Sequence, residues 1–590
     1  MKNRKVIDAK YKWNLKDIYK DENILKEDIS TLKTILGEVK EFKGKLNNPD
    51  KLLEYYEYSK KVDILFDKVF IYVYLNHAID TDNDKYNRML SEIEYMANGY
   101  NEASAFVLPE LNSYDVSYLE SLLEDERFKL HYMGIKDLIK NKVHILPHDV
   151  EEAMAKVSKI TGEFSEIYDG FDCIDLKIDN ALDSKGNSYE LTKANYSRIM
   201  QNEDRTLRKN ASTNLNATYK KNLATLTNTY IASVKKDCFY ADMYKYKDCL
   251  TKKVEGQDIN EKIFYNLIDN VNKHLYLYHN WLKVLKEALG YEKLYGYDLS
   301  VPLAKNTKEY SFDEGCEHIR KAIAPLGEDY VSMFEHSLQN NWYDVYPTLN
   351  KDTGGCCVSV YGEHPYILLN HEGTYNDVSA IAHELGHALH YYYTERKQPY
   401  EYNDITIFMA EMASTTNEVL LLKHMYETAK TREEKIFFLQ EYIDLFVGAL
   451  YIQTRNSEFE DFAHKLVEKS EPITRETLFN KHQELVAKYN GGVVEQSENS
   501  KHSFLIVPHY YRAYYMFSYA TGVTCAVNFA KMCEKGQEGI EKYREFLSSG
   551  SSDYPLNILK KCGIDLETDA PYEIIFEEFE WAINEIKSLL

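Results

Sequence analysis

The chain has 590 residues, 44% of them hydrophobic and 28% charged, which is the composition of a large globular protein with several domains. Its 94 acidic residues outnumber 71 basic ones, and the resulting net charge of -23 opposes non-specific binding to nucleic acid. We therefore expect no nucleic-acid partner.

The cysteines and the N-terminus bear on where the protein resides. Nine cysteines, an odd number, are scattered along the chain, which is not the pattern of a secreted disulfide framework. The basic start, residues 1–5, is followed by charged residues that interrupt any apolar signal core. We predict reduced thiols and a cytoplasmic location.

Most of the chain is predicted to form long helices with short connections. Charged and apolar residues recur at helical spacing, and only 12 prolines interrupt the chain. The clearest helical stretches are 52–78, 80–106 and 202–240. We predict a mainly α fold with three regions: a helical region over residues 1–110, a second helical region over 111–195 and a catalytic region over 196–590.

A short β element is predicted ahead of one helix. Residues 358–369 favour strand structure and are split by Gly362-Glu363-His364-Pro365, which predicts a small hairpin. Extended peptides often bind beside a sheet edge through main-chain hydrogen bonds. We expect residues 366–370 to provide such an edge, with an ordinary structural strand as the alternative.

The most informative motif is Ala382-His383-Glu384-Leu385-Gly386-His387. On an α-helix, histidines four residues apart share a face, so both rings can reach one metal ion. Glu384 lies about 100° around the helix, where it can approach a metal-bound water without binding the metal. This H-E-x-x-H pattern is typical of zinc hydrolases. The alternative is an ordinary amphipathic helix, but unpaired histidines beside an apolar stripe would be costly.

A third protein ligand is needed if one zinc position is to stay open for water. The metzincin pattern requires Gly at position 390 and His at 393, whereas the chain has His390 and Tyr393. The other option is a carboxylate on a second helix, and the helical run 408–418 carries Glu411. We therefore predict that Glu411 is the third ligand.

Three further carboxylates lie near this run. Glu401 and Asp404 compete as ligands, but they precede the apolar run and look like loop residues. Glu418 follows Glu411 by seven residues on the same helical face, from which it could hydrogen-bond a ligand histidine. A solvated helix glutamate is the alternative for Glu418.

Several segments in order along the chain resemble oligoendopeptidase F, in the thimet-oligopeptidase-like family of zinc metallopeptidases. These segments are residues 12–19, 365–370, 382–387, 410–415, 508–511, 519–522 and 554–565. The similarity covers essentially the whole chain. It implies a multi-helix, zincin-like metallopeptidase with a small β-sheet beside the zinc helix and helical lobes that enclose a substrate channel.

The motif and the resemblance together predict a zinc-dependent endo-oligopeptidase. We expect one Zn²⁺ per chain, held by His383, His387 and Glu411, with a zinc-bound water activated by Glu384. The expected partners are short unstructured peptides, which are cut at internal bonds, because a channel would exclude folded proteins.

A second group of candidates could stabilise the oxyanion formed during hydrolysis. Tyrosine O–H and imidazole N–H groups can donate hydrogen bonds to that charge. The chain has 51 tyrosines, so most of them are packing residues. The resemblance selects His509, Tyr511, Tyr515 and Tyr519, whereas Phe517 stands where related enzymes often show another tyrosine.

Two alternative functions and one candidate membrane segment follow from the sequence. A zinc carboxypeptidase of the same architecture would need a group that captures the terminal carboxylate of the substrate. A non-catalytic peptide-binding protein would have no use for Glu384 as a base. Residues 513–530 carry no charge, but their polar content favours a buried helix, so no membrane partner is expected.

Overall fold

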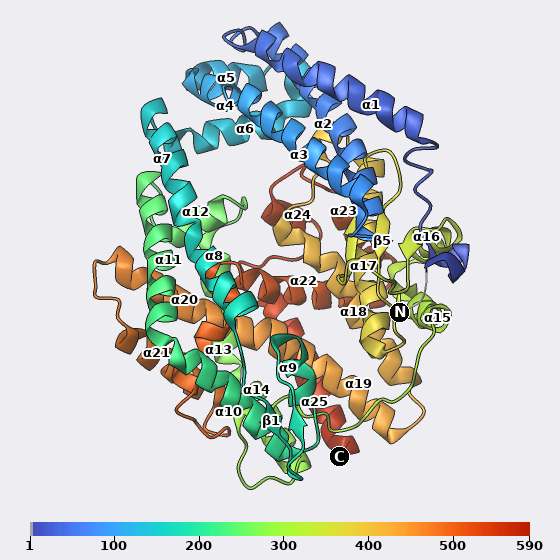
Figure 1. Ribbon diagram of the computed structural model, residues 1–590, viewed down its shortest axis with the longest axis vertical. Helices are drawn as coiled ribbons and strands as arrows, with labels where there is room; N and C mark the ends of the chain where they lie inside the picture. Colours follow the sequence, from blue (N-terminus) through green and yellow to red (C-terminus); the bar gives the residue numbers. More distant parts are fainter. Residues whose placement is uncertain (1–3) are drawn as a thin grey trace. The chain divides into compact units, whose positions relative to one another are not determined.

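The computed structural model describes residues 4–590 and divides into two compact units (Figure 1). Unit 1 comprises the chain up to Ile145, together with Lys308–Leu421 and Phe529–Gly563. Unit 2 comprises Leu146–Thr307, Leu422–Asn528 and Ile564–Leu590. The predicted region boundaries at residues 110 and 195 stay a prediction.

Both units are mainly helical, which confirms the predicted fold class. In unit 1 the α-helices are α1 (Glu22–Ile35), α2 (Pro49–Ala78), α3 (Asp84–Ser104), α4 (Val107–Ser113), α5 (Val116–Leu123), α6 (Tyr132–Asn141), α15 (Phe312–Ala322), α16 (Glu328–Gln339), α17 (Tyr375–Lys397), α23 (Gln537–Leu547) and α24 (Pro555–Lys561). Two helices, α18 (Ile407–Thr428) and α22 (Phe517–Glu534), contain boundaries between the units.

In unit 2 the α-helices are α7 (His148–Thr161), α8 (Glu163–Asp169), α9 (Lys193–Met200), α10 (Arg205–Lys221), α11 (Leu223–Met243), α12 (Cys249–Glu255), α13 (Glu261–Lys273), α14 (Leu275–Ala288), α19 (Arg432–Phe446), α20 (Gln453–Glu468), α21 (Arg475–Asn490) and α25 (Ala570–Leu589). A two-stranded antiparallel sheet pairs β1 (Ala181–Leu182) with β2 (Ser188–Tyr189). A π-helical segment, Val447–Ile452, joins α19 to α20.

The predicted helices are found with one difference. Helices α2 and α3 occupy the first two predicted stretches, but residues 202–240 form two helices, α10 and α11, with a break at Asn222. Asn222 has a non-helical backbone (φ -114°, ψ 16°), and its side-chain amide donates to the carbonyl oxygen of Thr218 at 3.2 Å. Asparagine side chains often compete with helical hydrogen bonds in this way.

Unit 1 contains a three-stranded sheet in the order β3-β5-β4. Strands β4 (Cys356–Val358) and β5 (Tyr366–Leu368) pair antiparallel, as the predicted hairpin requires. A third strand, β3 (Tyr343–Asp344), pairs parallel with β5. The prediction that residues 366–370 form a sheet edge is therefore wrong. The two-residue strand β3 was too short to predict, and it makes β5 the central strand.

The core of unit 1 places the sheet against α17. All three residues of β5 are buried, and Tyr366 and Leu368 belong to a hydrophobic cluster with residues of α1, α2 and α3. Helix α17 packs on β4 and β5. Its buried apolar residues are Val378, Ile381, Ala382, Leu385, Ala388 and Leu389. Full burial of each larger aliphatic side chain contributes about 1.5–3 kcal/mol, so packing against the sheet and against α15, α16 and α23 holds α17 in place.

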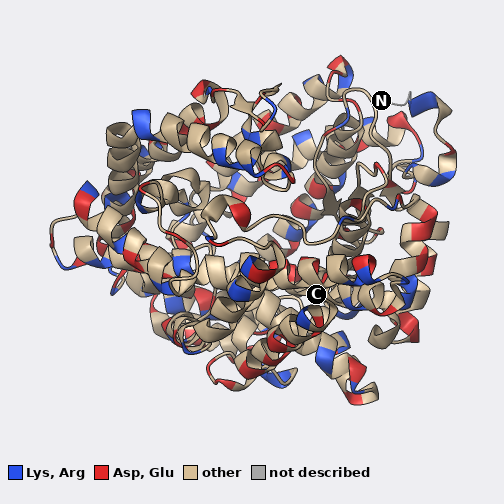
Figure 2. Ribbon diagram, turned by 90° about the horizontal axis from the view of Figure 1, so that it is seen from below, with Lys and Arg blue, Asp and Glu red and all other residues tan. Residues whose placement is uncertain are grey.

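The positions of the charged residues and the hydropathy of the helices are typical of helices that have one solvent-exposed face. Figure 2 shows acidic and basic residues interspersed along the helices. Within residues 4–590, only the helical run Arg432–Glu468 is long and apolar enough to span a membrane, and half of its most apolar window is buried. Burial of this kind is also found in core helices of large domains.

Candidate active site

Helix α17 carries the H-E-x-x-H motif and has a well-defined start. The Thr374 side chain accepts a hydrogen bond from the Asp377 backbone N–H, and the Asp377 carboxylate accepts one from the Thr374 N–H at 2.7 Å. This capping box satisfies two backbone donors at the helix N-terminus. The motif follows in the interior of the helix, where the i, i+4 geometry is regular.

Helix α18 approaches α17 closely at Gly386. A Cβ atom at Gly386 would lie 2.4 Å from the Ser414 Cα and 2.7 Å from the Ala413 carbonyl oxygen. The Asn417 amide also donates to the Ala382 carbonyl oxygen at 2.9 Å. Because only glycine allows the two backbones to come so close, Gly386 brings the carboxylate of α18 within reach of the histidines.

The three predicted ligands come together. The Nε2 atoms of His383 and His387 are 3.2 Å apart, and Glu411 Oε2 lies 3.5 Å from the first and 3.8 Å from the second. Donors about 2.0–2.2 Å from a tetrahedral zinc ion would be separated by about 3.4 Å. The two imidazoles and the carboxylate therefore match both the donor types and the spacing of a zinc site. We call these three residues the histidine cluster.

Glu418 orients the first histidine. Its Oε2 lies 3.2 Å from His383 Nδ1, and its Oε1 accepts a hydrogen bond from the Ser379 hydroxyl at 3.3 Å. Burial disfavours the charged His383 ring, but the carboxylates of Glu418, Glu384 and Glu411 together outweigh burial and raise the pKa of His383 to about 9. The Glu418 contact leaves Nε2 of His383 facing the other two donors, as in carboxylate–histidine–metal arrangements.

Glu384 lies beside the histidine cluster and is 8% exposed. Burial raises the pKa of its carboxyl group to about 7, and the charges of Glu411 and Glu418 act in the same direction. A Cβ atom at Gly355 would lie 3.3 Å from Glu384 Oε1. The segment just before β4 therefore comes close to the carboxylate because residue 355 has no side chain.

His387 differs from His383 in its protonation. Burial lowers the pKa of His387 to about 4, with a further contribution from the neighbouring His383. A neutral imidazole is the form that binds metal ions. The pair thus offers one ring held by a carboxylate and one ring that is already neutral.

Comparisons with known proteins agree with this site. The sequence pattern of Peptidase family M3 matches residues 198–578, and that of Oligopeptidase F matches residues 110–177. The chain belongs to Peptidase family M3. It is thus a metallopeptidase of the oligoendopeptidase F type, in a family that is zinc-dependent.

Relatives match the M3 chain along its whole length. Oligopeptidase PepF of Bacillus subtilis is 31% identical and covers 100% of this chain and 88% of its own. An oligoendopeptidase F homolog of Borreliella burgdorferi is 30% identical over 100% of both chains.

Two solved structures share the fold of this M3 peptidase. A putative peptidase from Chlamydophila abortus has a TM-score of 0.95 at 29% identity and covers 100% of both chains. Oligoendopeptidase-F from Enterococcus faecium has a TM-score of 0.73 at 27% identity, covering 96% of this chain and 99% of its own.

The competing ligand candidates of this M3 peptidase lie outside the histidine cluster. Glu401 forms an ion pair with Lys60 at 3.0 Å. His390 is 1% exposed, and its ring packs against Phe546 with the ring centres 5.1 Å apart. Burial lowers the pKa of His390 to about 3. Burial also raises the pKa of Asp404, which does not belong to the cluster.

Three of the four oxyanion candidates lie together in unit 2. The Tyr519 hydroxyl is 3.4 Å from His509 Nε2, and the Tyr515 ring stacks on His509 with 6.0 Å between ring centres. Tyr511 instead packs on Tyr168, with ring centres 4.6 Å apart. Phe517 is fully buried.

Two glycines that shape the site were not among the predicted site residues. Gly386 stands inside the motif, and a glycine within a buried stretch of helix is the signal for a close helix contact. Gly355 lies against the Glu384 carboxylate. Their importance depends on which backbone or side chain lies opposite, which the local sequence does not encode.

Proposed function

We propose that this M3 peptidase is a zinc-dependent endo-oligopeptidase that cuts internal bonds of short, unstructured peptides. The main support is the histidine cluster, whose three donor atoms lie within 4.8 Å of one another next to the buried Glu384. The family assignment makes the chain an oligopeptidase, and oligopeptidases act on peptides. A cytoplasmic location, which the reduced cysteines favour, is part of the proposal.

His383, His387 and Glu411 would hold the zinc ion, which when bound would lower the pKa of water and polarise the scissile carbonyl. Glu384 accepts the proton of the attacking water and then gives it to the leaving amine. With its pKa raised to about 7, Glu384 can both take up and release a proton near neutral pH.

The free edge of β4 is the proposed binding site for the substrate main chain. Among residues 4–590, β4 pairs only with β5, so its other edge has unpaired main-chain groups. Gly355, which immediately precedes β4, lies next to Glu384. A peptide added to this edge would place its carbonyl groups near the base, and main-chain pairing would bind many sequences alike.

His509, Tyr515 and Tyr519 are the proposed donors to the oxyanion. Burial and the nearby Arg512 lower the pKa of His509, which favours the neutral ring. A neutral ring and two phenols can donate hydrogen bonds without binding the metal. The family resemblance adds Tyr511 to the proposed donors, and its ring packs on Tyr168 with the hydroxyl buried.

A mixed substrate library tests this proposal. Short peptides blocked at both ends and intact folded proteins are incubated with the enzyme, with and without a chelator, and the products are identified by mass spectrometry. We expect internal cleavage of the blocked peptides, loss of cleavage with chelator, recovery with Zn²⁺ and no cleavage of folded proteins.

Two other results would contradict it. If blocked peptides stayed intact while free peptides lost residues from the C-terminus, the enzyme would be a carboxypeptidase. If folded proteins were cut as readily as peptides, the oligopeptidase assignment would be wrong.

A further inference from the structure

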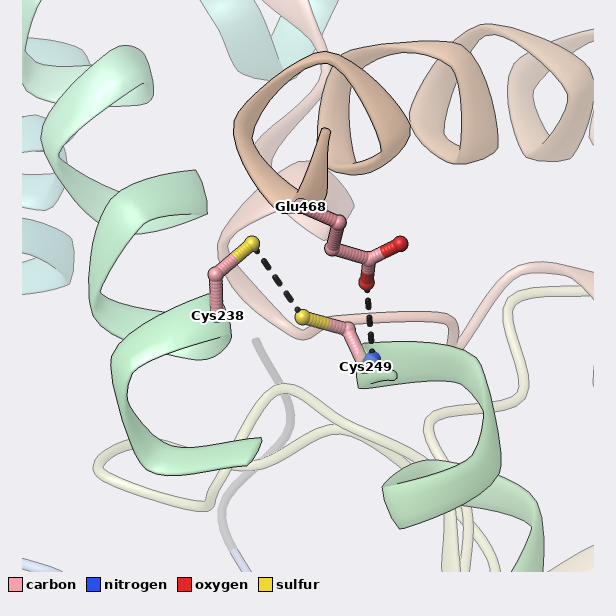
Figure 3. A group of neighbouring side chains, drawn as sticks. All are labelled: Cys238, Cys249 and Glu468. Atoms are coloured by element: carbon pink, nitrogen blue, oxygen red, sulfur yellow. Dashed lines mark hydrogen bonds between the residues drawn. The ribbon is translucent and has the colours of Figure 1, made fainter. Parts of the chain in front are cut away.

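Unit 2 contains a second group of metal-binding side chains, Cys238, Cys249 and Glu468, which we call the cysteine cluster (Figure 3). Cys238 lies in α11, Cys249 is the first residue of α12, and Glu468 is the last residue of α20. Their donor atoms all lie within 4.8 Å of one another. Two consecutive helices, α11 and α12, and the distant helix α20 therefore contribute one donor each.

The two sulfur atoms and the carboxylate face one another. The Cys249 thiol donates to Cys238 Sγ at 3.3 Å, and Glu468 Oε1 accepts a hydrogen bond from the Cys249 backbone N–H at 2.8 Å. That hydrogen bond uses one carboxylate oxygen, and the carboxylate has a second.

Both basic and acidic side chains surround the cluster. Lys236 pairs with Asp237 at 3.2 Å, so its charge is already balanced. His464, the nearest imidazole, has Nδ1 2.9 Å from the Glu460 carbonyl oxygen and Nε2 3.5 Å from Asp237. Both its nitrogens are engaged, so His464 is not available as a ligand.

We propose that Cys238, Cys249 and Glu468 bind one thiophilic divalent cation, with Zn²⁺ as the reference ion, at a site separate from the histidine cluster. Two thiolates on a tetrahedral zinc ion are about 3.8 Å apart, so small side-chain rotations from the observed 3.3 Å are enough. Cys238 and Glu468 are partly exposed, which leaves water to fill the fourth position. Binding would release the thiol protons to solvent.

The bound ion would act as a structural link between α11, α12 and α20. Cys249 is only 4% exposed, and Asp237, the carboxylate next to Cys238 in the chain, is held by Lys236 and His464. The cysteine cluster therefore offers metal binding without a base that could activate water.

Cobalt spectroscopy combined with metal counting tests this proposal on the full-length chain. The protein is stripped with a chelator under reducing conditions and titrated with Co²⁺ and, separately, with Zn²⁺. We expect two ions per wild-type chain and a thiolate-to-cobalt charge-transfer band. The variant H383A should bind one ion and keep the band, whereas C238S/C249S should bind one ion and lose it.

Two further variants protect the test against misfolding. Glu468→Gln keeps the acceptor for the Cys249 N–H but removes the charge, and we expect the affinity of the band-forming site to fall more than about tenfold, since even outer-shell changes typically cost about 10- to 100-fold. Cys173→Ser removes an exposed cysteine outside the cluster and should change nothing.

Three results would overturn the proposal. They are one ion per wild-type chain, a charge-transfer band that persists in C238S/C249S, and an unchanged affinity in E468Q. A Cys238–Cys249 disulfide that forms while Zn²⁺ is present under reducing conditions would also overturn it, because the pair would then be a redox couple and not a metal site.

Discussion

The histidine cluster and the cysteine cluster both gather three metal-binding side chains, but they are assembled differently. The histidine cluster takes its donors from two consecutive helices, α17 and α18, that touch at Gly386. The cysteine cluster takes two donors from the consecutive helices α11 and α12 and its third from α20, which lies much later in the sequence. Only the first has Glu384 as a buried carboxylate beside the donors and Glu418 as an orienting partner.

This difference separates catalysis from metal binding. Donor atoms at suitable distances are enough to hold an ion, whereas hydrolysis also needs a base next to the ion and a fixed ring orientation. We therefore expect changes in the histidine cluster to abolish peptidase activity. Changes in the cysteine cluster should alter only the metal content.

The largest combined loss of metal and activity is expected for Glu411→Ala. With only two imidazoles left, the site should lose its ion, and kcat/KM should fall by at least about a thousandfold. Glu401→Ala is the matched control, because Glu401 was the competing ligand and pairs instead with Lys60. Peptide hydrolysis and metal content are measured together. Loss of the metal in E401A but not in E411A would reverse the ligand assignment.

Gly386→Ala tests whether the contact between α17 and α18 builds the histidine cluster. The added Cβ would meet the Ser414 Cα at 2.4 Å, so we expect the free energy of unfolding to fall by about 3 kcal/mol. Gly99→Ala, in the exposed interior of α3, has nothing within 4 Å of the added Cβ and should stabilise by about 0.5–1 kcal/mol. Urea unfolding compares the two variants. Equal stability of G386A and wild type would refute the close contact.

Glu418→Gln tests the orienting contact that the cysteine cluster lacks. Removing the charge beside His383 Nδ1 should lower the zinc affinity of the histidine cluster by about 10- to 100-fold. Glu427→Gln, an exposed position on the same helix, is the control. Affinity is measured by competition with a chromophoric chelator. Equal affinities for the two variants would show that Glu418 is only a solvated helix glutamate.

The smallest effect is expected for the double variant C238S/C249S. Its kcat/KM for a short peptide should stay within about twofold of wild type, because the cysteine cluster lies outside the catalytic machinery. The assay is run at a temperature at which the variant is folded, as checked by circular dichroism. A loss of activity comparable to that of E411A would mean that the two clusters are not independent.

The histidine cluster could be predicted from the sequence because helical geometry is local. Two histidines four residues apart must share a face, and Glu411 follows on the next helix. The cysteine cluster could not be predicted this way. Cys238, Cys249 and Glu468 meet only through tertiary packing, and their spacing matches no local motif.

In the fold, too, local patterns could be predicted from the sequence but long-range pairing could not. The helical periodicity predicted α2 and α3, and the turn residues predicted the β4–β5 hairpin. The pairing of β3 with β5 joins segments separated by a loop and involves two residues per strand, too few to leave a sequence pattern. That pairing made the predicted edge strand a central one, and it leaves β4 as the edge next to Glu384.

Hydrolysis by Glu384→Gln, measured together with zinc content, tests the central claim most directly. The substitution keeps the shape of the side chain but removes the base, so we expect kcat to fall by about 10⁴-fold while zinc per chain stays at the wild-type value. Glu395→Gln is the control, because Glu395 lies on the same helix and burial also raises its pKa to about 7, yet it bonds to Ser359. E395Q should keep its activity. Near-normal hydrolysis by zinc-loaded E384Q would contradict the mechanism.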